Sequence, residues 1–233
     1  ARLTVHEGKK LGKMDLTNES QALLAKAAVE NGLFTVESIE TKPLTRNPPP
    51  PFTTSTLQQE AARKLGYSAS HTMRIAQQLY EDGAITYMRT DGVQMDGSAI
   101  SAARKAIADR YDASYVPDSP RIYKTKAKNA QEAHEAIRPT SFTTRTVGSG
   151  DHAKLYDLIL KRAMASQMAS ARLERTTVEM LDGTGKTGLR ANGQVVKFPG
   201  FLALYEEGRD DDKDEDSGLL PAMSKGDSPA KKS

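Results

Sequence analysis

The sequence predicts an α+β protein in which a helical domain is inserted into a discontinuous, antiparallel β-rich domain. Two observations support this fold class. Segments with helix-cap residues fill the middle of the chain, whereas short alternating runs with turn residues occupy both ends. With 233 residues, the chain is long enough for two domains with cores of their own. We expect the β-rich domain to comprise residues 1–46 and 172–233, and the helical domain residues 47–171.

The first β-rich part contains a helix and a strand. Asn18 is a favourable N-cap with Gln21 three residues later, and Gly32 ends the predicted helix after "QALLAKAAVEN". The alternating run "LFTVESIETKPLT", Leu33 to Thr45, is rich in β-branched residues and predicts a strand. The stiff polyproline segment "RNPPPPF" follows it, and we interpret this segment as the passage between the two domains.

Two capped helices open the central domain. In "TSTLQQ", Ser55 is the predicted cap and Gln58 completes a capping box, and Gly66 ends this helix. A short turn leads to a second helix, "HTMRIAQQLYED", which is closed by Gly83. Two helices, a tight turn and a following strand form the order of a winged helix-turn-helix, a motif that binds DNA in many proteins.

The remaining elements complete the alternation of helical and β-rich regions. A third helix is predicted near Ser98 to Arg110, and Asp151 is the expected cap of a long amphipathic helix that runs to about Met168. From Arg172 onward, the runs "RTTVEML", "KTGLRA" and "QVVKF" are separated by "DGTG", "NG" and "PG". Such spacing is typical of antiparallel hairpins.

Composition and charge indicate a globular protein that neither spans a membrane nor contains disulfides. The content of 37% hydrophobic and 27% charged residues is that of a polar globular chain, without a run of about 18 apolar residues that could span a membrane. Cysteine is absent, which excludes disulfides and fits a cytoplasmic location. An acidic run at 206–216 holds eight acidic and two basic residues, while the rest of the chain has 31 basic and 22 acidic residues. A basic body of this kind suits a polyanionic partner such as nucleic acid.

The stretch "YEDGAITYMRTDGVQM" carries the first candidate site. If "AITYMR" is a strand, Ile85, Tyr87 and Arg89 share one face, and the phenol and the guanidinium can bind one phosphate together. A nearby cation lowers the cost of the phenolate form of a tyrosine nucleophile. The alternative is an ordinary half-buried strand, with a packed tyrosine and an arginine in solvent.

The stretch "HEAIRP" carries the second candidate site. If it is helical, His134 and Arg138 lie four residues apart on one face, and both can converge on a phosphate. The alternative is a Glu135–Arg138 ion pair beside a core isoleucine, Ile137. The basic body shows no cluster of carboxylates with metal-ligand spacing, so we expect no metal site within this chain.

Taken together and in this order, "TSTLQQ", "ITYMRTD" and "HEAIRP" resemble the motifs of the bacterial DNA topoisomerase I family, the type IA topoisomerases. The resemblance runs nearly end to end and includes "LLPAMSKGD" near the C-terminus. It implies that Tyr87 attacks a DNA phosphodiester to form a 5′-phosphotyrosyl link and that Arg89 binds the scissile phosphate. It further implies that His134 contacts DNA near the cleavage site and that Arg138 has a DNA-contact or structural role.

The resemblance also implies an architecture and a set of partners. The fold would be the mobile arch of a toroidal enzyme, with the helical domain held on a β-rich strap. Members of the family are ATP-independent isomerases that relax negative supercoils and use Mg²⁺ bound by a toprim domain, which this sequence lacks. We therefore expect the isolated chain to be inactive. Its expected partners are single-stranded and negatively supercoiled DNA and the toprim and C-terminal DNA-binding regions of the same polypeptide, with no membrane partner.

Three other interpretations make different predictions. A winged-helix module that binds DNA without catalysis would tolerate loss of the Tyr87 hydroxyl. A tyrosine recombinase would form a link to the 3′ end, and its tyrosine normally follows its arginine and histidine, whereas Tyr87 precedes His134. A purely structural arch would have negligible affinity for single strands even at low salt.

Overall fold

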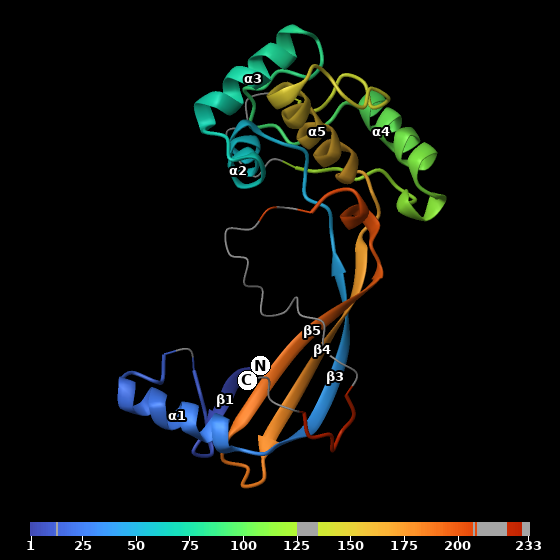
Figure 1. Ribbon diagram of the computed structural model, residues 1–233. Helices are drawn as coiled ribbons and strands as arrows, with labels where there is room; N and C mark the ends of the chain where they lie inside the picture. The colour runs from blue at the N-terminus through green and yellow to red at the C-terminus, as the bar shows by residue number, and fades with distance from the viewer. Residues whose placement is uncertain (13, 125–134, 207, 209–222, 230–233) are drawn as a thin grey trace. The chain divides into compact units, whose positions relative to one another are not determined.

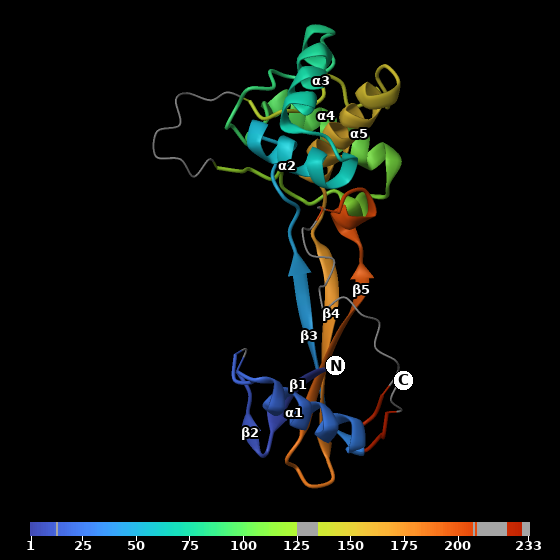
Figure 2. The same cartoon turned by 60° about the vertical axis from the view of Figure 1, so that its left-hand side comes forward.

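The computed structural model describes residues 1–12, 14–124, 135–206, 208 and 223–229, and the chain forms two compact units (Figures 1 and 2). The β-rich unit contains Ala1–Leu44 and Leu173–Lys197 together with the described C-terminal residues. The helical unit contains Thr45–Arg172 and the described residues from Phe198 to 208. The segment 198–206, which the sequence assigned to the β-rich domain, therefore lies in the helical unit.

The β-rich unit is built on one five-stranded sheet with the strand order β2-β1-β5-β4-β3. Strand β1 pairs antiparallel with both β2 and β5. The arrows of β3 and β5 run opposite to that of β4 (Figure 1), so the mixed α+β architecture with an antiparallel sheet is confirmed. The strands span Arg2–His6 (β1), Lys9–Lys10 (β2), Phe34–Arg46 (β3), Ala171–Asp182 (β4) and Gly188–Phe198 (β5).

A small apolar core holds one end of this sheet together. Its buried side chains come from β3, β4 and β5: Phe34, Val36, Val178, Met180 and Ala191. The helix α1, Glu19–Asn31, lies against it through Val29. The predicted N-cap of α1 is confirmed, since the Asn18 side chain accepts a hydrogen bond from the Gln21 amide. The strand predicted for Leu33 to Thr45 is also confirmed as β3.

Two expectations for this sheet were wrong. Asn192 and Gly193 do not form a turn but lie inside β5, because pairing with β4 continues through them and the Asn192 Oδ1 atom accepts a hydrogen bond from Thr177 at 3.1 Å. A single hairpin, with its turn between β4 and β5, therefore accounts for the runs that were predicted to form several antiparallel hairpins. The first ten residues, for which no element was predicted, contribute β1 and β2.

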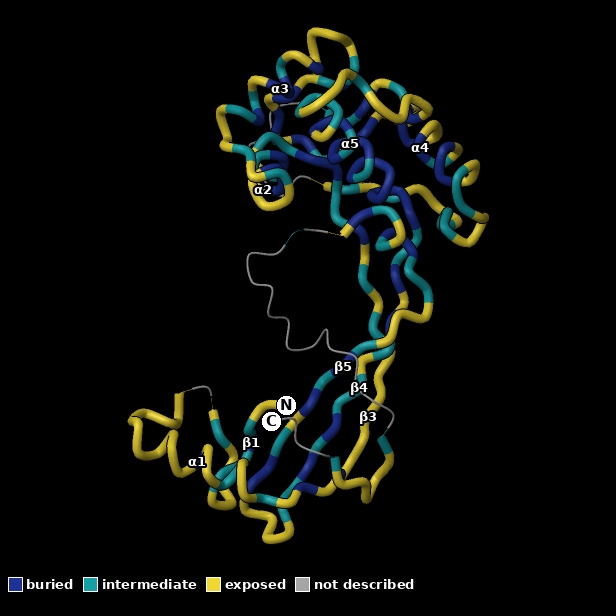
Figure 3. The backbone as a smooth tube through the Cα atoms, viewed as in Figure 1, coloured by how far each residue is buried: buried dark blue, intermediate teal, exposed yellow. Residues whose placement is uncertain are grey.

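The helical unit is packed around the helix α5. Helices α2, α3 and α4 all contact α5, and the buried parts of the chain concentrate there (Figure 3). Fully buried side chains include Leu57 on α2, Leu79 on α3, Ile107 on α4, and Leu155 and Ile159 on α5. The helices span Thr54–Leu65 (α2), Ala69–Glu81 (α3), Gly97–Arg110 (α4) and Gly150–Ala165 (α5), with short 3₁₀ turns at Ala113–Tyr115 (η1) and Gly200–Ala203 (η2).

Helix starts in this unit differ from the predicted ones. The N-cap of α2 is Thr53, which forms a reciprocal capping box with Thr56, and Ser55 lies inside the helix. Asp151 is not the cap of α5, because its carboxylate forms hydrogen bonds with Tyr67 and His71 and not with the first amides of the helix. Among the described residues, none of the helices is long and apolar enough to cross a membrane.

Candidate active site around Tyr87

The stretch "AITYMR" does not form the strand that alternation predicted. Only Ile85 pairs, in an isolated bridge with Pro139, and the residues around Tyr87 are irregular. A strand needs a neighbouring strand along its length. Here the backbone instead bonds to a short extended segment on one side of Tyr87 and to the start of α2 on the other.

Side chains still alternate in burial, although not as a strand would place them. Ile85, Met88 and Thr90 are buried, while Tyr87 is 44% exposed and Arg89 is exposed. The prediction that Ile85 shares a face with Tyr87 and Arg89 was therefore wrong. Tyr87 and Arg89 both reach solvent because the buried Met88 between them anchors the backbone.

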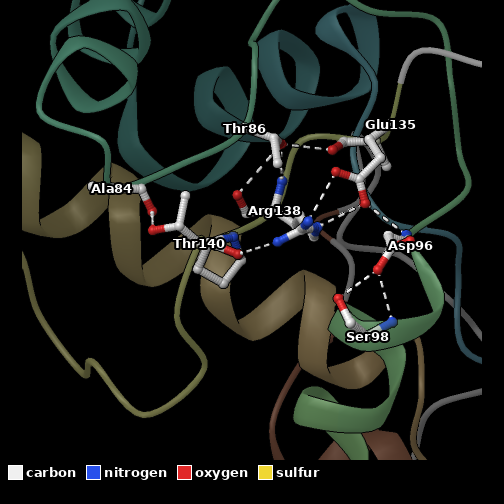
Figure 4. A network of polar contacts seen from close by, with 9 residues as sticks. Ala84, Thr86, Asp96, Ser98, Glu135, Arg138 and Thr140 are labelled. Carbon is white, nitrogen blue, oxygen red and sulfur yellow. Dashed lines mark hydrogen bonds and ion pairs between the residues drawn. The ribbon is translucent and has the colours of Figure 1, made fainter.

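Thr86 fixes the backbone before Tyr87 (Figure 4). Its hydroxyl donates to the carbonyl of Ala136 at 2.7 Å and accepts from the amide of Arg138 at 3.0 Å. The Thr86 amide in turn donates to the carbonyl of Arg138 at 2.9 Å. Farther back, the Thr140 amide donates to the carbonyl of Ala84 at 2.9 Å. The segment that leads into Tyr87 is thus bonded along its length to residues 136–140.

The Tyr87 ring lies against a second exposed tyrosine. The centroids of Tyr80 and Tyr87 are 5.3 Å apart with an interplanar angle of 68°, an edge-to-face contact. Within the described part of the chain, the side chains of Tyr87 and Arg89 have no hydrogen bond or ion pair. Arg89 therefore presents an unpaired planar fork of donors beside the tyrosine, which suits recognition of a phosphate.

Arg138 is arranged differently from Arg89. Its guanidinium donates twice to the Glu135 carboxylate, at 3.0 and 2.8 Å, and once to the carbonyl of Pro139 at 3.0 Å (Figure 4). Glu135 also accepts from the amide of Asp96, which caps α4 by accepting from the amide of Ser98. The pair thus joins the start of α4 to the segment that supports Thr86.

The helical interpretation of "HEAIRP" was wrong over the residues that the structure describes. Residues 135–139 are extended, because Ile137 and Pro139 form bridges with Phe52 and Ile85. The alternative of a Glu135–Arg138 pair beside a buried Ile137 is the observed arrangement. His134 lies outside the described residues.

A second polar cluster joins α3 to α5 and was not found by sequence reasoning. Asp151 accepts from the Tyr67 hydroxyl at 2.8 Å and bonds His71 Nε2 at 2.8 Å, while Arg74 contacts His71 Nδ1 at 2.8 Å. The hydrogen bonds from His71 and Tyr67 hold the pKa of Asp151 below its usual value. Burial, followed by the hydrogen bond to Asp151, raises the pKa of Tyr67 to about 12. A phenol held in its neutral form in this way is a poor nucleophile, so we assign this cluster a structural role.

A third cluster ties the polyproline passage to the returning chain. The buried Arg162 donates to the carbonyl of Pro50 at 2.6 Å and to the hydroxyl of Tyr205 at 3.0 Å. The Tyr205 hydroxyl donates to the buried Glu60 at 2.8 Å. These partners are up to 145 residues apart in sequence, which is why no local pattern identified them.

The described residues around Tyr87 and Arg89 offer no site for a metal ion. In the described ranges, no group of three or more His, Asp or Glu side chains has an arrangement that could hold a metal ion. These residues therefore do not fit a divalent cation.

Comparisons with known proteins identify related chains. A family model described as DNA topoisomerase matches residues 2–233. DNA topoisomerase 1 of Zymomonas mobilis is 63% identical over all of this chain, which covers 20% of that protein. The Streptomyces coelicolor protein of the same name is 47% identical over 90% of this chain, which covers 23% of that protein.

A solved structure shows the same arrangement of the chain. Full-length topoisomerase I from Thermotoga maritima matches with a TM-score of 0.75 and 33% identity, over 97% of this chain and 38% of that one. The chain thus spans about a fifth to a quarter of the two curated relatives and somewhat more of the solved one.

Proposed function

The chain belongs to the bacterial DNA topoisomerase I family, the type IA topoisomerases, and we propose that it supplies the nucleophile of such an enzyme. In this proposal Tyr87 attacks a phosphodiester of single-stranded DNA. The single observation that supports it most is the placing of Tyr87 and Arg89, both exposed, on either side of the buried Met88. Each flank of this short segment is fixed by a threonine hydroxyl.

The proposed step exchanges one phosphoester for another. The phenolic oxygen of Tyr87 loses its proton and forms a bond to phosphorus, the bond from phosphorus to the 3′ oxygen breaks, and the 3′ oxygen takes up a proton to become a hydroxyl. The DNA stays attached through a 5′-phosphotyrosyl link. Because the number of ester bonds is unchanged, attack by the 3′ hydroxyl reseals the strand without ATP, which allows negative supercoils to relax between the two steps.

Arg89 has the electrostatic role in this proposal. Its unpaired guanidinium lies two residues from the nucleophile and can donate two hydrogen bonds to the scissile phosphate, whose negative charge rises in the transition state. His134 is proposed to contact DNA near the same phosphate. For Arg138 we propose a positioning role, because its donors are directed to Glu135 and the Pro139 carbonyl.

Other parts of the reaction lie outside this chain. We propose that Mg²⁺ is held by a toprim domain elsewhere in the enzyme, since the described residues here do not fit the ion. It follows that the isolated chain does not relax supercoiled DNA. Since the substrate would be bacterial DNA, we place the activity in the cytoplasm.

A chimera tests the assignment of the nucleophile. In the DNA topoisomerase 1 of Zymomonas mobilis, this chain replaces the stretch that it matches at 63% identity. The chimera is mixed with a single-stranded oligonucleotide labelled at each end in turn, and the reaction is stopped with denaturant. We expect a covalent adduct that retains the 3′ portion of the strand, is absent in Tyr87→Phe and persists in Tyr80→Phe.

The Tyr80→Phe control is matched, because Tyr80 is also exposed and its ring touches that of Tyr87. An adduct that survives Tyr87→Phe would refute the proposal, because another residue of the chimera would then be the nucleophile. The described residues also disfavour a winged-helix module, because α3 is followed there by an isolated bridge and not by a wing strand.

A further inference from the structure

We propose that Thr54, in the first turn of α2, is a positioning residue that fixes the backbone on both sides of Arg89 and so aims Arg89 and Tyr87 at the phosphate. This inference rests on the proposed function of Tyr87. Thr54 lies 33 residues before Tyr87 in the sequence and is partly buried.

The contacts of Thr54 use both the donor and the acceptor function of its hydroxyl. Its hydroxyl lies 2.8 Å from the carbonyl of Met88 and 3.1 Å from that of Thr90, and it accepts from the Thr90 amide at 2.8 Å. Its own amide donates to the Thr90 carbonyl at 2.9 Å. A hydroxyl has one donor and two acceptor lone pairs, so a single side chain bonds the residues before and after Arg89.

These contacts are not needed to start α2. The cap is provided by Thr53, and the reciprocal bond of the capping box comes from Thr56. The first amides of a helix have no partner within the helix, and the Thr54 amide finds one in Thr90. The hydroxyl of Thr54 thus does not cap the helix, and its hydrogen bonds all go to the backbone of Met88 and Thr90.

The local backbone explains why such a contact is required. Arg89 lies in a segment without strand pairing, and a ladder of backbone bonds therefore cannot fix its direction. Thr90 extends the fixed region, because its own hydroxyl accepts from the Gly92 amide at 2.9 Å. A displacement of about 1 Å in a catalytic group can lower a rate by about 10²-fold.

Two substitutions separate the hydroxyl of Thr54 from its shape. Thr54→Val keeps the branched shape and removes the hydroxyl, whereas Thr54→Ser keeps the hydroxyl. In the chimera described above, Thr54→Val should slow formation of the covalent adduct at saturating oligonucleotide by about 10- to 100-fold, while the Kd for the oligonucleotide changes less than about twofold. Thr54→Ser should stay within about threefold of the parent rate.

Thr72→Val is the matched control for stability. Thr72 is fully buried in α3 of the same unit, and its hydroxyl donates to the Ser68 carbonyl at 2.9 Å, a bond within the first turn of the helix. This variant should lower Tm about as much as Thr54→Val and leave the rate of adduct formation unchanged.

The outcomes distinguish this inference from the proposed function. Loss of rate in Thr54→Val with rescue by Thr54→Ser supports the positioning role. The inference is overturned if Thr54→Val has the parent rate, if serine fails to rescue, if only the Kd changes, or if Thr72→Val loses the same rate. Failure of the proposed function appears elsewhere, as an adduct that persists in Tyr87→Phe.

Discussion

Strand β3 and the segment Ala84–Thr90 share an alternating pattern of side chains, yet they fold differently. Phe34–Arg46 forms a continuous strand of 13 residues. Ala84–Thr90 forms one isolated bridge, at Ile85. Alternation in a sequence thus does not specify a ladder, and in Ala84–Thr90 it also gave the wrong face for Ile85. A ladder also requires a neighbouring strand of matching length, which β4 supplies to β3.

The partners of the two backbones account for the difference. In β3 the backbone groups pair with the neighbouring strand β4. In Ala84–Thr90 the backbone bonds to the hydroxyl of Thr54 and to the backbone of Arg138 and Thr140, while the Thr86 hydroxyl bonds to the backbone of Ala136 and Arg138. This leaves two exposed side chains, Tyr87 and Arg89, on either side of the buried Met88.

The largest difference is expected at that methionine. Met88 is 1% exposed, and Met88→Ala should lower the free energy of unfolding of the helical unit by about 2–5 kcal/mol, through lost burial and a cavity. The matched change in β3 is Ile39→Ala, at a side chain that is 36% exposed, and it should cost less than about 1 kcal/mol. Chemical denaturation followed by circular dichroism measures both. Equal losses of unfolding free energy in the two variants would show that Met88 does not anchor the irregular segment.

The next largest effect concerns the exposed cation. Arg89→Ala should lower the rate of adduct formation in the chimera by about 10²–10³-fold, because a donor to the transition-state charge is removed. Stability should be unchanged, since Arg89 is exposed. Lys42→Ala is the control in β3, where an exposed cation pairs with Glu40. A normal rate in Arg89→Ala would remove the proposed electrostatic role.

Much of the scaffold could be predicted from the sequence, because it depends on local signals. The cap at Asn18 and the strand β3 were confirmed, and each is determined by residues close to it in the chain. Helices α2 to α5 were also predicted, although their first residues were not, because Thr53 competes with Ser55 as a cap and only the packing decides between them.

The arrangement around Tyr87 could not be predicted in the same way. Its supports come from residues that are distant in sequence, as Thr54 is from Thr90 and Thr86 is from Ala136. A threonine near the start of a helix suggests a cap, and nothing local distinguishes one that bonds a distant backbone. The residues Tyr87, Arg89, His134 and Arg138 were singled out by their spacing, and their proposed roles came from motif resemblance.

The smallest expected effect compares one residue type in the two regions. Thr86→Val removes a donor to the Ala136 carbonyl and an acceptor for the Arg138 amide, both in a partly buried place. It should lower the free energy of unfolding by about 1–3 kcal/mol, because these backbone groups lose their partner. Thr41→Val in β3 removes an exposed hydroxyl that lies 3.3 Å from that of Thr176, and water can replace this bond.

We therefore expect Thr41→Val to change the free energy of unfolding by less than about 0.5 kcal/mol. Urea denaturation of each variant beside the parent chain measures the difference. If Thr86→Val and Thr41→Val both changed the free energy of unfolding by the same small amount, the Thr86 hydroxyl would be dispensable. The backbone bonds of residues 136–140 alone would then hold the segment before Tyr87. If Thr86→Val is the costly one, the irregular segment depends on side-chain hydroxyls for the order that β3 obtains from its neighbouring strand.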